Sequence, residues 1–237
     1  MRNGVAYDMI REMTKDKEGF TVKKAILFDL DGTLTDSGKG IRNGAKYVLD
    51  FYGICEPNPE NLNRLIGPPL PETMRALYGI DEPDDSVIEN KFREYYTEKG
   101  IFENRVYDGV YDALRALRRN FSLFVATSKP EFMAEKVLSH FGLLPLFDGL
   151  IGATRDLSLV HKPDIIAAVL QKYSLKKEET FMVGDRKYDM TGAIACGVCP
   201  IGAAWGFGSV SELLRANAAF VLDEPSQMPA FFEKFSA

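Results

Sequence analysis

The chain has 237 residues, of which 46% are hydrophobic and 27% are charged, and its formal net charge is −5 at pH 7. This composition is typical of a soluble globular protein with one large or two modest domains. It offers no basic face or arm for nucleic acid, and no apolar run near the ~20 residues that a membrane helix needs. The N-terminus also lacks the apolar core of a signal peptide, so we expect a cytoplasmic protein that binds neither nucleic acid nor membrane.

The first strand is predicted after a polar extension, residues 1–22, to which the sequence assigns no function. The apolar run Ala25–Phe28 has the length and composition of a strand buried on both faces. It leads into Asp29 and Asp31, which point to the same side of an extended chain, and Gly32 allows a tight turn after them. Two adjacent carboxylates repel each other, so a cation or a shared proton is expected beside them.

The next segment is predicted to be helical. Apolar residues recur at helical spacing over about 38–52, and further helices are predicted over 71–77 and 85–99. No strand signal appears between residues 35 and 104, and an all-helical connection of this length is best explained as an inserted domain. The predicted organisation is therefore an extension (1–22), a core domain (23–38 and 107–237) and a helical domain (39–106).

Strands and helices alternate through the rest of the chain. Strands are predicted at 121–126, 147–151, 180–183, 198–201 and 220–222, and helices at 109–118, 130–141, 162–173, up to about 196, and 209–215. This alternation predicts an α/β fold whose mostly parallel sheet is covered on both faces. Cys196 and Cys199 have the spacing of a redox or metal pair, but without a second pair we interpret them as small buried residues.

Polar residues follow three of these strands. Asp29 and Asp31 follow the first, Thr127 and Ser128 follow the strand at 121–126, and Asp185 follows the strand at 180–183. The ends of parallel strands meet at one edge of a sheet, which is where open α/β proteins bind ligands. Alone, each residue has an ordinary explanation as a helix cap or turn residue. Their joint occurrence, with Lys162 at a helix start, favours a site.

In this order the residues resemble the four motifs of the haloacid dehalogenase superfamily of phosphohydrolases. The resemblance covers the chain from Lys23 onward. Within that superfamily, the chain is similar to the phosphoglycolate phosphatases and their small-metabolite relatives through residues 29–37, 127–130, 141–143, 184–189 and 205–208. The resemblance implies a Rossmann-like catalytic domain, with the helical insertion acting as a cap that closes over the site. Residues of this cap that would contact the substrate are Gly67, Pro69 and Arg75.

The resemblance also implies a role for each motif residue. Asp29 would be the nucleophile that forms an aspartyl-phosphate, and Asp31 the general acid and base. The side chains of Asp29 and Asp185 and the backbone carbonyl of Asp31 would bind Mg²⁺, with Asp189 behind them or orienting Lys162. The groups that would hold the phosphoryl oxygens and offset their charge come from Asp29, Gly32, Thr127, Ser128 and Lys162.

The leading hypothesis is a Mg²⁺-dependent phosphatase for a small phosphorylated metabolite such as phosphoglycolate, a nucleotide or a sugar phosphate. It would act as a monomer or a homodimer. Two alternatives stay open, namely a phosphotransferase similar to sugar-phosphate mutases such as β-phosphoglucomutase, and a non-catalytic phosphate-binding protein. Asp108 stands before Gly109 where the phosphoglycolate phosphatases usually carry proline, which weakens the case for phosphoglycolate itself.

Overall fold

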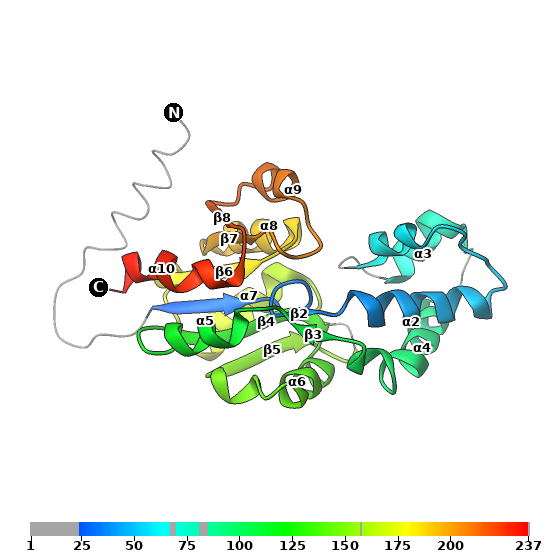
Figure 1. Cartoon of the computed structure of the whole chain (residues 1–237), viewed down its shortest axis with the longest axis horizontal. Coiled ribbons are helices and arrows are strands. Elements are labelled where there is room, and N and C mark those ends of the chain that lie inside the picture. Colours follow the sequence, from blue (N-terminus) through cyan, green and yellow to red (C-terminus); the bar gives the residue numbers. More distant parts are fainter. Residues whose placement is uncertain (1–23, 67–69, 81–84, 157, 237) are drawn as a thin grey trace. The chain divides into compact units, whose positions relative to one another are not determined.

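A computed structural model of the chain describes residues 24–66, 70–80, 85–156 and 158–236. The chain divides into two compact units (Figure 1). The helical unit is Thr35–Val106, and the sheet unit consists of Met1–Leu34 and Tyr107–Ala237. The N-terminal extension, Gly67 and Pro69 lie outside the described residues, so the expectations for them remain predictions.

The sheet unit is built on six parallel strands in the order β5-β4-β1-β6-β7-β8. The strands are β1 (Ala25–Phe28), β4 (Ser122–Pro130), β5 (Gly149–Ala153), β6 (Thr180–Gly184), β7 (Cys199–Ala203) and β8 (Phe220–Leu222). All residues of β1, β6 and β7 are buried, as expected for strands covered on both faces. The predicted parallel α/β sheet is therefore confirmed.

Helices pack on both faces of this sheet (Figure 1). On one face Ala25 and Leu27 join a core with Ile165 and Ile166. On the other, the ring of Phe181 packs edge-on against Phe232 at 5.2 Å between centroids. The helices are α5 (Val110–Leu117), α6 (Glu131–His140), α7 (Lys162–Lys172), α8 (Lys187–Cys196), α9 (Val210–Arg215) and α10 (Met228–Phe232), with 3-10 turns η3 (Leu144–Leu146), η4 (Lys177–Glu179), η5 (Pro225–Gln227) and η6 (Glu233–Phe235).

The helical unit has its own apolar core, formed by residues such as Val48, Leu49, Met74 and Ile88. Its elements are β2 (Thr35–Asp36), α2 (Gly38–Phe51), η1 (Pro59–Leu65), α3 (Leu70–Tyr78), α4 (Asp85–Tyr96), η2 (Gly100–Phe102) and β3 (Arg105–Val106). Strands β2 and β3 form an antiparallel pair, so the expectation of no strand between residues 35 and 104 was wrong. Because β2 pairs with β3, the compact unit begins at Thr35, whereas the sequence placed the start of the helical domain at residue 39.

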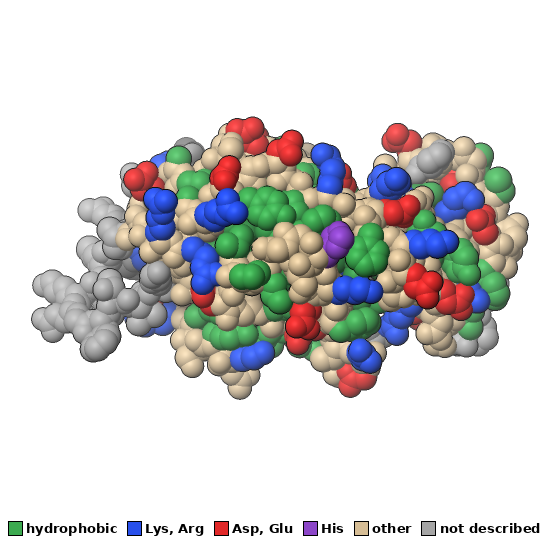
Figure 2. Space-filling model, turned by 60° about the horizontal axis from the view of Figure 1, so that its bottom comes forward, with side chains coloured by type: hydrophobic (Ala, Val, Ile, Leu, Met, Phe, Trp, Pro, Cys, Tyr) green, Lys and Arg blue, Asp and Glu red, His purple; other side chains and the backbone are tan. Residues whose placement is uncertain are grey.

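The surface carries mixed charge. On the face shown in Figure 2, acidic and basic side chains are interspersed, and neither sign forms a continuous patch. Among the described residues, none of the helices has the length and apolar character needed to cross a membrane.

Candidate active site

The site lies where the three central strands end. β1 pairs with β4 on one side and with β6 on the other. The backbone N–H of Asp29 donates to the carbonyl of Val183 at 3.0 Å, so the chain stays in register with β6 up to the first acidic residue. The sheet thereby brings Asp29, the Thr127 end of β4 and Asp185 to the same edge, as the order of the strands predicts.

Lys162 connects these strand ends. It is the first residue of α7, its side chain is 4% exposed, and its Nζ donates to the carbonyl of Ala126 at 3.1 Å. The same Nζ lies 2.9 Å from Oδ1 of Asp29 and 2.8 Å from Oδ1 of Asp189. Burial alone would lower the pKa of Lys162, but the charges of Asp189 and Asp29 raise it above its ordinary value. The lysine is therefore a fixed positive charge.

Three carboxylates converge at this edge, and Lys162 pairs with two of them, Asp29 and Asp189. One oxygen from each of Asp29, Asp185 and Asp189 lies within 4.8 Å of the others. Burial raises the pKa of Asp29 to about 6, against the opposing charge of Lys162. Burial, followed by the charges of Asp189 and Asp29, raises the pKa of Asp185 well above its ordinary value. The raised pKa values show that carboxylates gathered here need positive charge beyond Lys162, and three oxygen donors at this spacing fit a divalent cation such as Mg²⁺.

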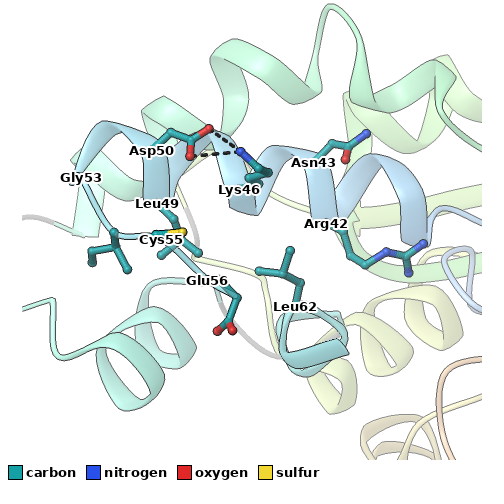
Figure 3. A pocket seen from close by; sticks show the side chains of 10 residues that line it. Arg42, Asn43, Lys46, Leu49, Asp50, Gly53, Cys55, Glu56 and Leu62 are labelled. Atoms are coloured by element: carbon teal, nitrogen blue, oxygen red, sulfur yellow. Dashed lines mark hydrogen bonds and ion pairs between the residues drawn. The ribbon is translucent and has the colours of Figure 1, made fainter. Parts of the chain in front are cut away.

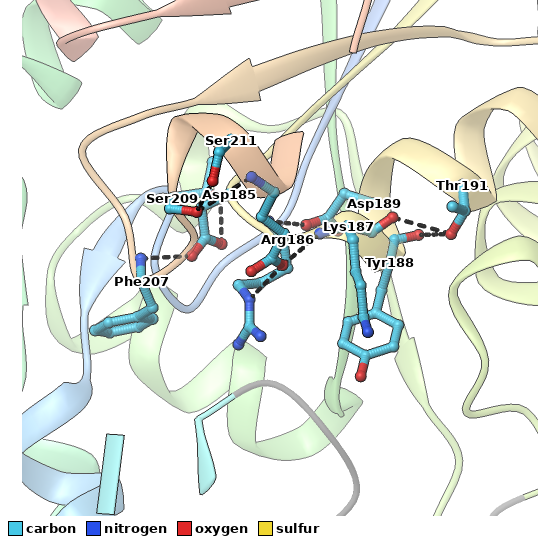
Figure 4. Close-up of polar contacts among 11 residues, drawn as sticks. Asp185, Arg186, Lys187, Tyr188, Asp189, Thr191, Phe207, Ser209 and Ser211 are labelled. Atoms are coloured by element: carbon cyan, nitrogen blue, oxygen red, sulfur yellow. Dashed lines mark hydrogen bonds and ion pairs between the residues drawn. The ribbon is translucent and has the colours of Figure 1, made fainter. Parts of the chain in front are cut away.

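Asp189 is held on both sides. Its Oδ2 accepts the backbone N–H of Arg186 at 3.0 Å in the first turn of α8 (Figure 4). Its Oδ1 faces Nζ of Lys162. With both oxygens engaged, Asp189 is placed to orient Lys162, as expected from the sequence. Gly184 is required beside it, because a Cβ there would overlap the Asp189 carboxylate.

The second acid of the first motif faces a different cation. Oδ2 of Asp31 lies 2.8 Å from Nζ of Lys129, whose side chain is 5% exposed. The buried Oδ1 of Asp31 accepts no hydrogen bond from the described residues. Sequence reasoning did not place Lys129 in the site. The available signal was its place in the run of residues 127–130 after the apolar strand, although the register of β4 shifts between Ala126 and Pro130 and spacing alone does not fix its side.

Three hydroxyl residues, Thr127 and Ser128 in β4 and Thr33 after β1, lie at the same edge of the sheet as the acids. Thr127 is buried, its Oγ1 accepts the backbone N–H of Lys129 at 3.2 Å, and its hydrogen bond to Asp29 opposes the rise in the pKa of that acid. Ser128 is half-buried beside it. The hydroxyl of Thr33 donates to Oδ1 of Asp185 at 3.3 Å, a contact that sequence reasoning also missed.

Of the residues proposed for substrate contacts, the structure describes Arg75 alone, and it belongs to the helical unit. Arg75 lies in α3 of the helical unit, where it forms an ion pair with Asp85. A pocket of about 520 Å³ lies in the same unit, between α2 and the segment that follows it (Figure 3). Its charged residues are engaged within the unit, since Lys46 pairs with Asp50 and Glu56 accepts from Tyr78. The chemistry of the acids, not pocket size, therefore locates the candidate site.

The comparisons identify the family. Residues 26–203 match the model of the haloacid dehalogenase-like hydrolases. The chain belongs to this family. A 5'-nucleotidase of Pseudomonas aeruginosa is 41% identical over 189 residues, covering 79% of this chain and 86% of that protein. Tyrosine-protein kinase PtkA of Mycobacterium tuberculosis is 38% identical over 197 residues, covering 83% of this chain and 67% of the kinase.

Further haloacid dehalogenase-like proteins agree with this assignment. A phosphoglycolate phosphatase of Aquifex aeolicus is 30% identical over 214 residues, covering 86% of this chain and 94% of that protein. The crystal structure of a predicted phosphatase from Clostridium acetobutylicum has a TM-score of 0.85 at 37% identity, covering 90% of this chain and all of that one (100%). The expected family and fold are confirmed, and the chain is a phosphatase of this hydrolase family.

Proposed function

We propose that the chain is a Mg²⁺-dependent phosphatase that hydrolyses a small phosphorylated metabolite through an aspartyl-phosphate on Asp29. The observation that carries this proposal is that one oxygen from each of Asp29, Asp185 and Asp189 lies within 4.8 Å of the others at the end of the central strands, with Lys162 paired to two of these acids. A structural ion pair needs one acid for its base, whereas three carboxylates converge here and burial makes each additional one costly.

The proposed metal ligands are the side chains of Asp29 and Asp185 and the backbone carbonyl of Asp31. When bound, Mg²⁺ supplies positive charge that allows an anionic nucleophile to approach an anionic phosphoryl group. Lys162 and the hydroxyl and amide groups of Thr127, Ser128 and Gly32 hold the phosphoryl oxygens, and these contacts stabilise charge in the transition state.

The reaction divides into two steps at two carboxylates. In the first, an oxygen of Asp29 forms a bond to phosphorus, the bond from phosphorus to the leaving oxygen breaks, and Asp31 gives that oxygen a proton. In the second, Asp31 takes a proton from water as the water oxygen attacks phosphorus. The bond to Asp29 breaks, which releases inorganic phosphate and returns both acids to their initial states. The unpaired Oδ1 of Asp31 is the oxygen we assign to this proton transfer.

Among the candidate substrates, nucleoside 5'-monophosphates come first. The support is the 41% identity to a protein named 5'-nucleotidase, against 30% for the phosphoglycolate phosphatase. The helical unit is proposed to be the cap, with Gly67, Pro69 and Arg75 contributing to the choice of substrate. Specificity in such an arrangement comes from contacts to the part of the substrate that does not react.

The test is phosphate release from a panel of nucleoside 5'-monophosphates, phosphoglycolate and sugar phosphates, with Mg²⁺ and after chelation. We expect the highest kcat/KM on a nucleotide, and loss of turnover with chelator on every substrate. Higher kcat/KM on phosphoglycolate would overturn the substrate assignment alone. Undiminished hydrolysis after exhaustive metal removal would overturn the metal-dependent mechanism.

A second candidate function follows from the 38% identity to a protein named tyrosine-protein kinase. The same Asp29 would then pass its phosphoryl group to a tyrosine hydroxyl in place of water. A matched assay that measures free phosphate and phosphotyrosine from the same donor separates the two. We expect free phosphate to account for the turnover, and phosphotyrosine as the main product would favour the transferase.

A further inference from the structure

The loop that follows β7, residues 204–208, contacts two parts of the acidic cluster at once. The indole Nε1 of Trp205 donates to the backbone carbonyl of Thr33 at 2.9 Å. The backbone N–H of Phe207 donates to Oδ2 of Asp185 at 2.7 Å (Figure 4). The 204–208 loop therefore joins the turn after Asp31 to the carboxylate that follows β6.

The loop backbone lies too close to these residues to carry side chains at two positions. A Cβ on Gly206 would overlap both the Cβ of Asp185 and the carbonyl oxygen of Gly32. A Cβ on Gly208 would overlap the carbonyl oxygen of Asp185. The close approach is thus built into the sequence of the loop, because only glycine fits at both places.

The effect on Asp185 is to fix both of its oxygens. Oδ2 accepts the backbone N–H of Phe207, and Oδ1 accepts the hydroxyl of Thr33. The carbonyl of Thr33 in turn accepts the indole N–H of Trp205. An oxygen of this carboxylate lies within 4.8 Å of oxygens of Asp29 and Asp189, so like groups crowd it. The hydrogen bonds from Thr33 and Phe207 fix its orientation in this crowded place.

We propose that the 204–208 loop is a positioning element for the metal site, and that Trp205 is a positioning residue within it. The loop holds Asp185 and the Gly32–Thr33 turn in place before the cation binds. Binding therefore costs less conformational entropy of the metal ligands. Residues that orient metal ligands commonly change metal affinity when they are replaced. This inference rests on the proposed Mg²⁺ site.

The test is calorimetric titration of Mg²⁺ into metal-free protein, in wild type and in Trp205→Phe, which keeps the aromatic ring and removes the N–H donor. We expect Mg²⁺ to bind about 5- to 10-fold more weakly to the variant, the effect of one lost hydrogen bond that orients a ligand. At saturating Mg²⁺, kcat should stay within about 3-fold of wild type, because no reacting group changes.

The matched control is Tyr111→Phe, which removes a hydrogen bond from the Tyr111 hydroxyl to the carbonyl of Phe141 in the same unit. It should bind Mg²⁺ like wild type. A Trp205→Phe protein that binds Mg²⁺ as tightly as wild type, or a Tyr111→Phe protein weakened to the same extent, would overturn the inference. A wild-type protein that binds no Mg²⁺ would instead overturn the proposed metal site.

A second variant covers the case in which Trp205→Phe does not fold. Thr33→Val has nearly the same shape as wild type but removes the donor to Asp185. Together with Thr33→Ser, which keeps that donor, it asks whether the turn held by the loop orients the carboxylate. We expect weakened Mg²⁺ binding in Thr33→Val and wild-type binding in Thr33→Ser, and equal affinity in both would contradict the proposal.

Discussion

At the scale of single residues, Asp29 has the largest share of the proposed chemistry. It faces Lys162 at 2.9 Å and lies at the end of a fully buried strand. Asp29→Asn keeps the size of the side chain and removes the nucleophilic oxygen. We expect turnover to fall by about 10³-fold or more, since a nucleophile is being removed, with an unchanged fold. Steady-state phosphate release and circular dichroism test this, and full activity in the Asp29→Asn variant would exclude the mechanism.

The pKa of Asp29 gives a prediction about stability. Burial raises this pKa from 3.8 to about 6 in the folded, metal-free chain, so between these values the folded state holds its proton more tightly than the unfolded state. The free energy of unfolding must then decrease as pH rises from about 4 to about 6, by up to about 3 kcal/mol from this group. Below pH 4 both states are protonated, and this destabilisation is absent.

Urea denaturation of metal-free protein across this pH range measures the effect. Because other acids titrate as well, the informative quantity is the difference in unfolding free energy between wild type and Asp29→Asn. Relative to wild type, the variant should gain stability as pH rises from about 4 to about 6. A difference that stays constant with pH would show that Asp29 has an ordinary pKa.

At the scale of elements, helix α2 depends on a close approach to η2. A Cβ on Gly40 would overlap the carbonyl oxygen of Gly100 within the helical unit. We expect Gly40→Ala to lower the free energy of unfolding by about 1–3 kcal/mol, because a backbone atom cannot yield as a side chain does. The neighbouring exposed Lys39 supplies the control, and Lys39→Ala should change stability by no more than about 0.5 kcal/mol. Similar midpoints for both variants in thermal melts would contradict this packing.

The elements also show what the sequence could predict. The buried strand β1 and helix α7 were predicted because apolar runs and helical spacing are local properties. The pair β2–β3 was missed because strands of two residues show no periodicity and form only when distant segments meet. The short helix α10 was also missed.

In the site, too, some features could be predicted from the sequence and others depend on contacts between distant residues. Asp29 and Asp185 were brought together by a rule of topology, since the ends of neighbouring parallel strands share an edge, and Lys162 was expected there from its place at a helix start. The contacts of Lys129, Thr33 and Phe207 could not be predicted in this way. Each depends on which atom of a distant residue a side chain or backbone N–H reaches, as with Phe207 and Asp185.

At the scale of the whole molecule, Mg²⁺ should control stability as well as activity. A ligand that binds only the folded state at 100 times its dissociation constant adds about 2.7 kcal/mol to the free energy of unfolding. We expect Mg²⁺ to raise the melting temperature of the sheet unit and a chelator to lower it. The shift should be absent in Asp185→Asn, and Na⁺ at matched ionic strength serves as the control. An equal shift in Asp185→Asn would place the stabilising cation elsewhere.

The most direct test of the central claim is to identify the residue that carries the phosphoryl group. The chain is incubated with Mg²⁺ and a nucleoside 5'-monophosphate labelled in its phosphate, quenched in acid, digested and analysed by mass spectrometry. Asp31→Asn is tested with a labelled aryl phosphate, whose leaving oxygen departs without a proton, so that only the second step needs the missing carboxylate and the covalent intermediate should accumulate. The account predicts an acid-stable, hydroxylamine-sensitive phosphoryl group on Asp29. A label on any other residue, or an Asp31→Asn protein that releases the aryl alcohol in a burst without becoming labelled, would contradict it.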